Sequence, residues 1–160
     1  MGKKYKVGYL IGRFQPFHKG HLHLIKRSFH YVDKLIIGIG SANIVNENNP
    51  LTLDVRWKML DEVMRREKLQ IKIVKIVPID DYLEDDDLWL KKALEKVGKF
   101  DVLIGNDDWT DSIFEKAGYK VLKLGFYKRY LYEGIKIREL MKQGKPWEKR
   151  VPEYLARYLA

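Results

Sequence analysis

Five short apolar segments recur along the chain, and the stretches between them space their apolar residues three or four apart. The segments are rich in valine, isoleucine, leucine and tyrosine, as buried β-strands are. Each is bounded by turn-forming or polar residues, as Pro78 bounds the third. The pattern therefore predicts five strands: residues 6–11, 34–40, 70–79, 100–105 and 119–124.

The stretches between the strands predict helices. Thr52 stands at an N-cap position, where its hydroxyl can accept a hydrogen bond from the first turn. The acidic run 85–87 suits the positive end of another helix dipole, and we interpret it mainly as a solvated helix start. Gly144 and Pro146 end a later helix, and a last one follows Pro152. The main predicted helices cover residues 20–32, 53–68, 85–97, 110–117 and 135–143.

Strands that alternate with helices favour an α/β fold with a doubly wound parallel sheet of about five strands. The chain has 160 residues, which is the size of one domain. We therefore expect a single domain over residues 1–160, with a short helical tail from about residue 133. In such sheets ligands bind beyond the carboxyl ends of the strands, so the candidate chemistry is expected there.

Composition narrows the possible functions. Thirty-one Lys and Arg residues against 22 Asp and Glu residues give a net charge of +9, which makes anionic partners worth testing. The chain has no cysteine, which excludes disulfide frameworks, thiol catalysis and iron–sulfur clusters. No apolar run approaches the roughly 18 residues of a membrane span, and the first apolar run is too short for a secretory signal. We expect a cytoplasmic protein with no membrane partner.

The first predicted strand runs directly into a distinctive ten-residue segment, residues 12–21, within which the next helix begins. It reads Gly-Arg-Phe-Gln-Pro-Phe-His-Lys-Gly-His. Free backbone N–H groups and the helix dipole make such a turn suitable for binding phosphate. Neither common phosphate loop is present, because there is no Gly-x-x-x-x-Gly-Lys-Ser/Thr, and Gly38 and Gly40 lack the third glycine of the dinucleotide fingerprint. A Rossmann dehydrogenase is therefore poorly supported.

Two histidines, His18 and His21, occupy this helix start. Three residues apart, they lie on one side of the helix, and Gly20 has no side chain to keep a phosphate from the backbone. The pair can donate hydrogen bonds to phosphate oxygens in a transition state, with Lys19 and Arg13 adding positive charge. A shuffled chain would contain His-x-Gly-His about once in a hundred, which favours a functional pair over chance.

This segment resembles the His-x-Gly-His segment of nucleotidyltransferases, and the whole run 12–21 resembles that of archaeal-type nicotinamide-nucleotide adenylyltransferases. The similarity extends over nearly the whole chain: residues 32–42, 49–52, 88–89 and 105–106, with Arg56, Tyr132 and Arg138. The resemblance implies that nicotinamide mononucleotide attacks the α-phosphorus of ATP through its 5′-phosphate. The products would be NAD and pyrophosphate, with Mg²⁺ accompanying ATP and no covalent enzyme intermediate. Such a transfer asks the protein mainly for positioning and charge stabilisation.

The resemblance also implies roles for individual residues. Those expected to act at the reacting phosphates are His18, His21, Arg13 and Arg138. Further contacts to ATP and its phosphates are expected from Gly12, Phe14, Gln15, Lys19, Gly20, Arg56, Gly134 and Lys136. The nicotinamide and its ribose are expected to contact Ser41, Asp80, Trp89, Asn106, Phe126 and Tyr132. We expect no metal site built from side chains.

Structural interpretations of some of these residues remain open. Trp89 is flanked by two leucines and could be a core residue, and Arg56 could lie on a solvated helix face. Asp80 or its neighbour Asp81 could accept from the amide or from a ribose hydroxyl. Arg138 could be an ordinary surface arginine. A zinc site is poorly supported, because only two further histidines exist and there is no cysteine.

The chain departs from the resembled family before the last predicted helix. Where the family has a serine and a threonine, this chain has Glu133 and Ile135, so both hydroxyls are missing. A carboxylate near a triphosphate would repel it, unless Glu133 turns outward or pairs with a cation. We expect Gly134, Lys136 and the helix N-terminus to supply the lost donors.

Two rival functions remain. The first is another nucleotidyltransferase, an FAD synthetase or a pantetheine-phosphate adenylyltransferase. The second is a nucleic-acid binding module, which the scattered basic pairs disfavour. The expected partners are therefore ATP and nicotinamide mononucleotide, with no nucleic acid, in a homo-oligomer that the resemblance suggests is a hexamer. The choice between the amide and the acid form of the mononucleotide stays open.

Overall fold

The computed structural model describes residues 4–159 and contains a five-stranded sheet in which all neighbouring strands are parallel. The strands are β1 (Tyr5–Gly12), β2 (Val32–Ile39), β3 (Ile73–Pro78), β4 (Val102–Gly105) and β5 (Val121–Lys123). Their order is β3-β2-β1-β4-β5, so the chain winds outward from β1 in both directions. The predicted doubly wound sheet is confirmed, and its switch point lies between β1 and β4.

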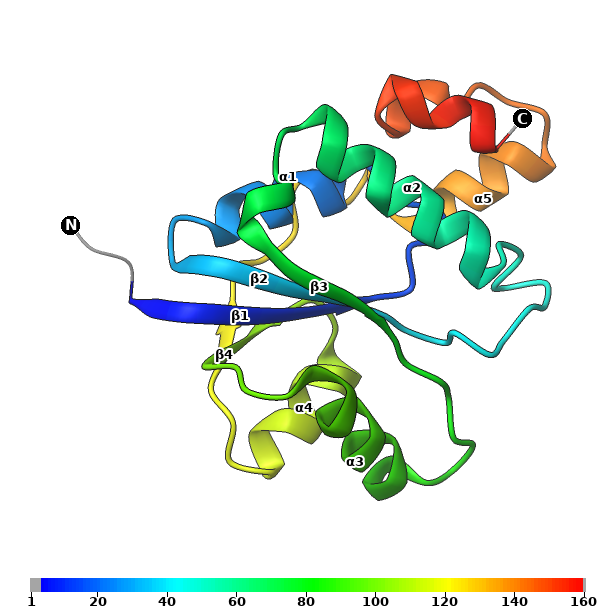
Figure 1. Cartoon of the computed structure of the whole chain (residues 1–160). Coiled ribbons are helices and arrows are strands. Elements are labelled where there is room, and N and C mark those ends of the chain that lie inside the picture. The colour runs from blue at the N-terminus through cyan, green and yellow to red at the C-terminus, as the bar shows by residue number, and fades with distance from the viewer. Residues whose placement is uncertain (1–3, 160) are drawn as a thin grey trace.

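Helices cover both faces of this sheet (Figure 1). Two of them, α1 and α2, lie on one face, and α3 and α4 lie on the other. The helix α5 and the C-terminal turns lie beside α2. The bounds are α1 Lys19–Ser28, α2 Leu53–Arg66, α3 Asp86–Val97, α4 Asp108–Lys116 and α5 Gly134–Lys142.

The central strands are buried on both faces, which explains their unbroken apolar runs. Leu10 and Ile37 point into the core beneath α1 and α2, whereas Tyr9 and Ile36 point into the core beneath α3 and α4. All four are at most 1% exposed. Since both faces of the central strands are filled, an open site is left only at the ends of the strands.

Two predicted boundaries and one predicted helix type were wrong. The first helix ends at Ser28 instead of residue 32, and Val32 begins β2. Residues 70–72 form a 3-10 turn before β3 rather than the start of that strand. The last predicted helix is a 3-10 turn, Glu153–Tyr158. In the first case an apolar residue spaced three from Phe29 fits a helix face and a strand start equally well, because spacing alone does not distinguish them.

The C-terminal turns contact α2 and the segment before α5. Val151 and Leu155 are fully buried, and Arg157 pairs with the buried carboxylate of Glu62 on α2. Arg150 donates to the carbonyl of Leu131 at 3.0 Å. The tail therefore holds the chain that leads into α5. Within residues 4–159, no helix is both long and apolar enough to cross a membrane.

Candidate active site

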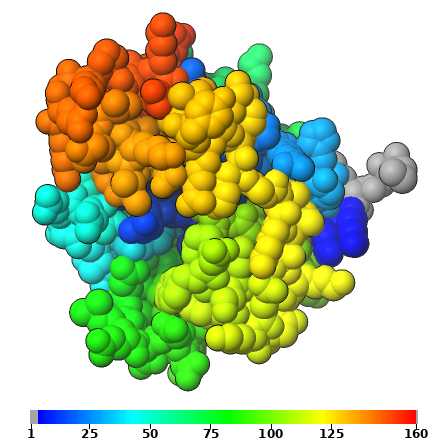
Figure 2. Space-filling view, turned by 180° about the vertical axis from the view of Figure 1, so that it is seen from behind, coloured from blue at the N-terminus to red at the C-terminus, as the bar shows by residue number. Residues whose placement is uncertain are grey.

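A cavity of about 670 Å³ opens at the carboxyl ends of the strands. It is lined by the turn from β1 into α1, the loop from β3 into α3, the turn from β4 into α4, and residues 125–138. Figure 2 shows this side of the molecule hollowed between the α3–α4 layer and the later segments around α5. The cavity occupies the place that the topology predicts for a ligand.

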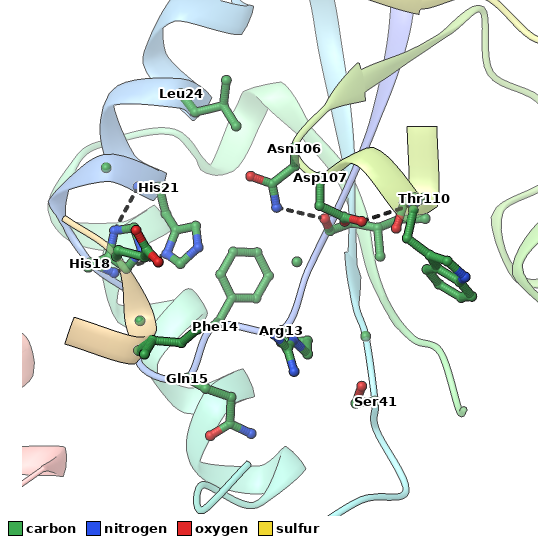
Figure 3. A pocket seen from close by; sticks show the side chains of 18 of the residues that line it. Arg13, Phe14, Gln15, His18, His21, Leu24, Ser41, Asn106, Asp107 and Thr110 are labelled. Carbon is green, nitrogen blue, oxygen red and sulfur yellow. Dashed lines mark hydrogen bonds between the residues drawn. The ribbon is translucent and has the colours of Figure 1, made fainter. Parts of the chain in front are cut away.

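His18 and His21 form a reciprocal cap at the start of α1 (Figure 3). The backbone N–H of His21 donates to Nδ1 of His18 at 3.3 Å, and the backbone N–H of His18 donates to Nδ1 of His21 at 3.1 Å. The two rings stack with centroids 3.7 Å apart. Both side chains line the cavity, so the helix cap and the candidate catalytic pair are the same residues.

This cap sets the tautomer of both rings. Because each Nδ1 accepts a hydrogen bond, each neutral ring carries its proton on Nε2, which makes Nε2 a donor. Burial lowers the pKa of His18 to about 3. Burial, and then the charge of His18, hold the pKa of His21 well below its usual value. Without a ligand, both rings are therefore neutral at pH 7, and each keeps one N–H donor available for an oxygen.

Gly20 must be a glycine for packing reasons. A Cβ atom at this position would lie 2.9 Å from Cε1 of His18 and 3.1 Å from Cβ of Tyr132. From the sequence, we expected a glycine here because it leaves room for a phosphate. The structure adds that a side chain here would push the His18 ring out of its stack.

Arg138 links the helix α5 by a hydrogen bond to the turn from β1 into α1. Its Nη1 donates to the carbonyl of Gln15 at 2.8 Å, and the side chain lines the cavity. Gln15 is held in turn by two bonds to the backbone of Leu51, at 3.0 and 2.9 Å. Arg13 lines the same side and is exposed. Two arginines therefore stand beside the two histidines, as an anion site requires.

Arg56 was predicted as a phosphate contact, and this prediction is wrong. The residue is 0% exposed and does not line the cavity. Its Nη1 donates to the carbonyls of Gly40 at 2.7 Å and Arg13 at 3.0 Å, and its Nη2 donates to that of Ser41 at 3.1 Å. Its guanidinium donates to backbone carbonyls, so it supports the floor of the cavity from beneath the lining.

Three other predicted residues lie outside the cavity lining: Lys19, Asp80 and Lys136. Asp80 is exposed, while its neighbour Asp81 lines the cavity, because successive residues of an extended chain point in opposite directions. Lys136 lies 3.6 Å from the carboxylate of Glu133, which also pairs with Arg129 at 3.1 Å. Glu133 thus meets two cations, and Lys136 lies beside this carboxylate and outside the cavity lining.

The remaining predicted residues do line one cavity. They come from five separate parts of the chain: Gly12, Arg13, Phe14, Gln15, His18, Gly20, His21, Ser41, Trp89, Asn106, Phe126, Tyr132, Gly134 and Arg138. Asn106 donates from Nδ2 to the carbonyl of Ile11 at 3.1 Å and so ties β4 to the end of β1. The tertiary fold brings together residues more than 100 positions apart.

Trp89 is both a core residue and a cavity residue. It is only 2% exposed and packs edge-on against Phe114 in the core. It also meets Trp109 edge-on, with centroids 4.8 Å apart, and both tryptophans line the cavity. Trp109, which is 49% exposed, was missed by the sequence analysis. Its position just after the candidate residue Asn106 was the available signal.

Asp111 was also missed. Its side chain is buried beneath the turn after β4 and accepts weakly from the backbone N–H of Asn106 at 3.4 Å. Burial raises the pKa of this carboxyl to about 6. A titratable group therefore supports Asn106 from below without lining the cavity.

A second aromatic group lies in residues 125–132. The Tyr127 ring stacks on His23 of α1 with centroids 3.8 Å apart, and Tyr132 lies parallel to it at 6.0 Å. The guanidinium of Arg129 lies 4.2 Å from the ring centroid of Phe126. The cavity thus contains two places where a flat ring could stack.

Comparison with known proteins gives the family. The cytidylyltransferase-like family model matches residues 9–129. The nicotinamide-nucleotide adenylyltransferase of Archaeoglobus fulgidus is 38% identical over 152 residues, covering 92% of this chain and 87% of that protein. The enzyme of the same name from Thermoplasma acidophilum is 39% identical, covering 94% of this chain and 83% of that protein.

Solved structures share the fold. A bifunctional NMN adenylyltransferase/ADP ribose pyrophosphatase from Francisella tularensis superposes with a TM-score of 0.81 and 23% identity over 97% of this chain. This chain spans 50% of that protein. A nicotinic acid mononucleotide adenylyltransferase from Plasmodium falciparum superposes with a TM-score of 0.60 and 12% identity, covering 97% of this chain and 94% of that one.

Proposed function

This chain belongs to the family of the nicotinamide-nucleotide adenylyltransferases, and on that premise we propose that it makes NAD from ATP and nicotinamide mononucleotide. The 5′-phosphate oxygen of the mononucleotide attacks the α-phosphorus of ATP. The bond from that phosphorus to the bridging oxygen breaks, and pyrophosphate leaves. The protein forms no covalent bond to either substrate.

The histidine cap carries this proposal. The Nε2–H donors of His18 and His21 are fixed in place before any ligand arrives, because each ring is already held through its Nδ1. Fixed donors stabilise the charge that develops on the phosphate oxygens without a reorganisation cost at the moment of reaction. The N-terminus of α1 adds its dipole at the same point.

Two arginines, Arg138 and Arg13, add positive charge beside the two histidines. Arg138 keeps one donor on the Gln15 carbonyl, and its planar group offers further donors to the β and γ phosphates. Arg13 adds a second cation. In this proposal the residues bind and orient the triphosphate, and they draw charge toward the leaving pyrophosphate.

Mg²⁺ enters the proposal as part of the substrate. Within residues 4–159 the structure has no group of three or more metal-ligating side chains. In this proposal the cation arrives bound to ATP and is held mainly by phosphate oxygens and water. A Francisella tularensis neighbour was solved with AMP and a manganese ion, which supports the use of a divalent metal.

The test is a direct comparison of acceptors. Purified protein with ATP and Mg²⁺ is given nicotinamide mononucleotide, FMN or phosphopantetheine, and the adenylylated products are separated by chromatography. We expect NAD and pyrophosphate in equal amounts from the first acceptor only. Adenylylation of FMN or phosphopantetheine, with no NAD formed, would overturn the proposal.

Two proposals about partners accompany this function. We expect a homo-oligomer, and a hexamer would give a mass close to six times 19.0 kDa by light scattering. We also expect no sub-micromolar, salt-sensitive binding to a random oligonucleotide. We also propose a cytoplasmic location, which fractionation of source cells would test.

A further inference from the structure

One wall of the cavity is formed by the approach to α5, residues 125–133. Residues 125–130 of this segment are exposed, although Phe126, Tyr127 and Arg129 line the cavity. A segment with few buried apolar contacts opens easily unless other bonds hold it. The position of this wall therefore depends on the bonds at the two ends of the segment.

Arginine side chains hold both ends of the approach to α5 by their backbone carbonyls. At the start, Arg27 on α1 donates to the carbonyl of Leu124. Near the end, Nη1 of Arg150 donates to the carbonyl of Leu131 at 3.0 Å. Arg27 lines the cavity, whereas Arg150 lies outside the lining. Apart from its charge, Arg150 can therefore affect a ligand only through the segment that it holds.

Arg150 is a fixed anchor, because the C-terminal turns pack beside α2 (Figure 1). Val151 and Leu155 are both 0% exposed. The hydroxyl of Tyr154 donates to the carboxylate of Glu67, at the end of α2, at 2.7 Å. The bond from this arginine thus connects an exposed segment to a part of the molecule that burial holds in place.

The anchored carbonyl, that of Leu131, belongs to the peptide that leads into Tyr132. Tyr132 lies over Gly20 in the first turn of α1. A Cβ atom at Gly20 would be 3.1 Å from Cβ of Tyr132 and 2.9 Å from Cε1 of His18, so both side chains border the same space. A shift of Leu131 away from α1 would open this space and loosen the wall beside the candidate catalytic pair.

The start of α5 contacts the turn from β1 into α1 as well. A Cβ atom at Gly134 would lie 3.2 Å from the carbonyl oxygen of Gln15, and Nη1 of Arg138 donates to that oxygen at 2.8 Å. Arg138 lines the cavity beside Arg13 and is the candidate for the outer phosphates of ATP. The anchored carbonyl of Leu131 lies just before Gly134, so it also helps to set where Arg138 stands.

Resting on the function proposed above, we infer that Arg150 is a positioning residue for ATP. Its bond to the carbonyl of Leu131 holds Tyr132 and Arg138 against the turn from β1 into α1 before ATP arrives. Binding then costs less, because the wall has less conformational freedom to lose. The bonds that fix the two histidines lie within the turn itself. Loss of Arg150 should therefore weaken ATP binding and leave the bound complex able to react.

The experiment removes the anchor with Arg150→Met and, independently, with Arg150→Ala. Calorimetry measures Kd for ATP with Mg²⁺ and no mononucleotide, and steady-state kinetics measure KM for ATP and kcat. We expect Kd and KM for ATP to rise about tenfold, with kcat at saturating ATP within about threefold of that of the native chain. Arg150→Lys keeps a donor for the carbonyl and should hold Kd within about threefold of the native value.

Lys149→Met is the matched control. Lys149 belongs to the same turn as Arg150, is exposed and lies outside the cavity lining. Its substitution removes the same charge from nearly the same place. Kd for ATP should stay within about twofold, because exposed charges are screened over about 10 Å at 0.1 M salt. A control that weakens ATP binding as much as Arg150→Met does would mean that charge is responsible and would overturn the inference.

Three further outcomes would also overturn it. They are ATP binding of native strength in Arg150→Met and Arg150→Ala, equal weakening in Arg150→Lys, and loss of folding in both anchor-free variants, which would mark Arg150 as purely structural. Thermal melts report the folding.

Calorimetry with ATP alone separates this inference from the proposed function. If the native chain forms no NAD, the function has failed, yet ATP binding that is weak in Arg150→Met and normal in Arg150→Lys would still support the anchor. If NAD is formed and all variants bind ATP alike, only the inference has failed. A native chain that binds no ATP would overturn both.

Discussion

The turn from β1 into α1 and the approach to α5, residues 125–133, both face the phosphate side of the cavity, but different forces hold them. In the turn, Phe14, Gln15 and His18 are buried. Hydrogen bonds hold Gln15 and His18, and the Phe14 ring packs against Phe17 and His21. In the approach to α5, residues 125–130 are exposed, and Glu133 is held mainly by ion pairs. The first region is set by packing and the second by surface charge.

This difference teaches where the chain can vary. Buried hydrogen bonds are costly to break, because an unpaired buried group loses its bonds to water as well. Exposed ion pairs contribute between about 0 and 1 kcal/mol each and can be exchanged for pairs with a ligand. The resemblance seen in the sequence runs through the turn, whereas Glu133, in the approach to α5, departs from it. In the proposed function, the turn orients the reacting phosphate, and the approach to α5 contacts the outer phosphates.

The largest effect is expected from Arg56→Met, which removes the support beneath the turn. Three backbone carbonyls, those of Arg13, Gly40 and Ser41, would lose a buried donor. Each unsatisfied group costs about 1–3 kcal/mol, so the free energy of unfolding should fall by about 3 kcal/mol or more. For a chain of this length Tm should drop by about 10 °C in a thermal melt.

Lys58→Met is the control for this change. Lys58 lies on the same helix, is exposed, and pairs only with Asp54 one turn away. Its loss should cost less than about 0.5 kcal/mol. If Arg56→Met melted like the control, the buried hydrogen bonds would not be what fixes the turn.

His21→Ala is expected to lower kcat by about a hundredfold or more, which corresponds to about 2.7 kcal/mol of transition-state stabilisation. The substitution removes an Nε2–H donor and half of the reciprocal cap. Its cost in stability should be only about 1 kcal/mol, the usual value of a cap. Turnover measured with saturating substrates, beside a thermal melt, separates the two effects. Near-normal kcat would contradict the transition-state role of this histidine.

Burial of His18 should also make the stability of the fold decrease in acid. Burial holds the pKa of His18 at about 3, whereas a histidine in the unfolded chain titrates near 6.5. Between these values the unfolded state binds more protons, so the free energy of unfolding should decrease as the pH falls from about 6.5. Asp111 acts in the opposite direction: its raised pKa stabilises the fold at low pH and loses this effect as the pH rises through about 6.

Thermal melts at several pH values would check this expectation. His18→Asn keeps an oxygen that can cap α1 but has no titrating ring, so its Tm should fall less between pH 6.5 and 4 than that of the native chain. Parallel curves for the two proteins would mean that other groups cause the acid sensitivity.

The smallest effect is expected from Glu133→Ser in the approach to α5. This change frees Arg129 and Lys136 for phosphate and removes a negative charge near it. KM for ATP should fall by about two- to fivefold, as exposed ion pairs are worth little. Glu153→Ser, which removes an exposed charge from the tail, should leave KM unchanged. A rise in KM would show that Glu133 itself assists ATP binding.

Much of the fold was readable from the sequence because its signals are local. Apolar runs buried on both faces, as in β1 and β2, predict central parallel strands. The boundaries of elements were harder to predict where the same residue suits both a helix and a strand. Val32 fits the spacing of the preceding helix, but pairing with Tyr5 places it in β2. That pairing joins distant parts of the chain, so no local window contains it.

In the candidate site, too, the sequence identified some residues and not others. His18 and His21 could be found because their spacing and their place after the first strand are both local. Arg56 could not be assigned, because its neighbours Trp57 and Lys58 give no sign that its side chain turns inward toward three carbonyls. Trp109 was missed because its partner, Trp89, lies 20 positions earlier, and only packing of α3 against α4 brings them together.

The sequence by itself determined the order of strands and helices along the chain, the candidate phosphate-binding turn and the family, since each depends on neighbouring residues or on a contiguous motif. Only the tertiary structure decided which charges face the cavity. It turned Arg56 inward and placed Asp81 rather than Asp80 at the cavity lining. The physical reason is that charge acts through distance in space, and the distances between these groups exist only after the sheet has formed.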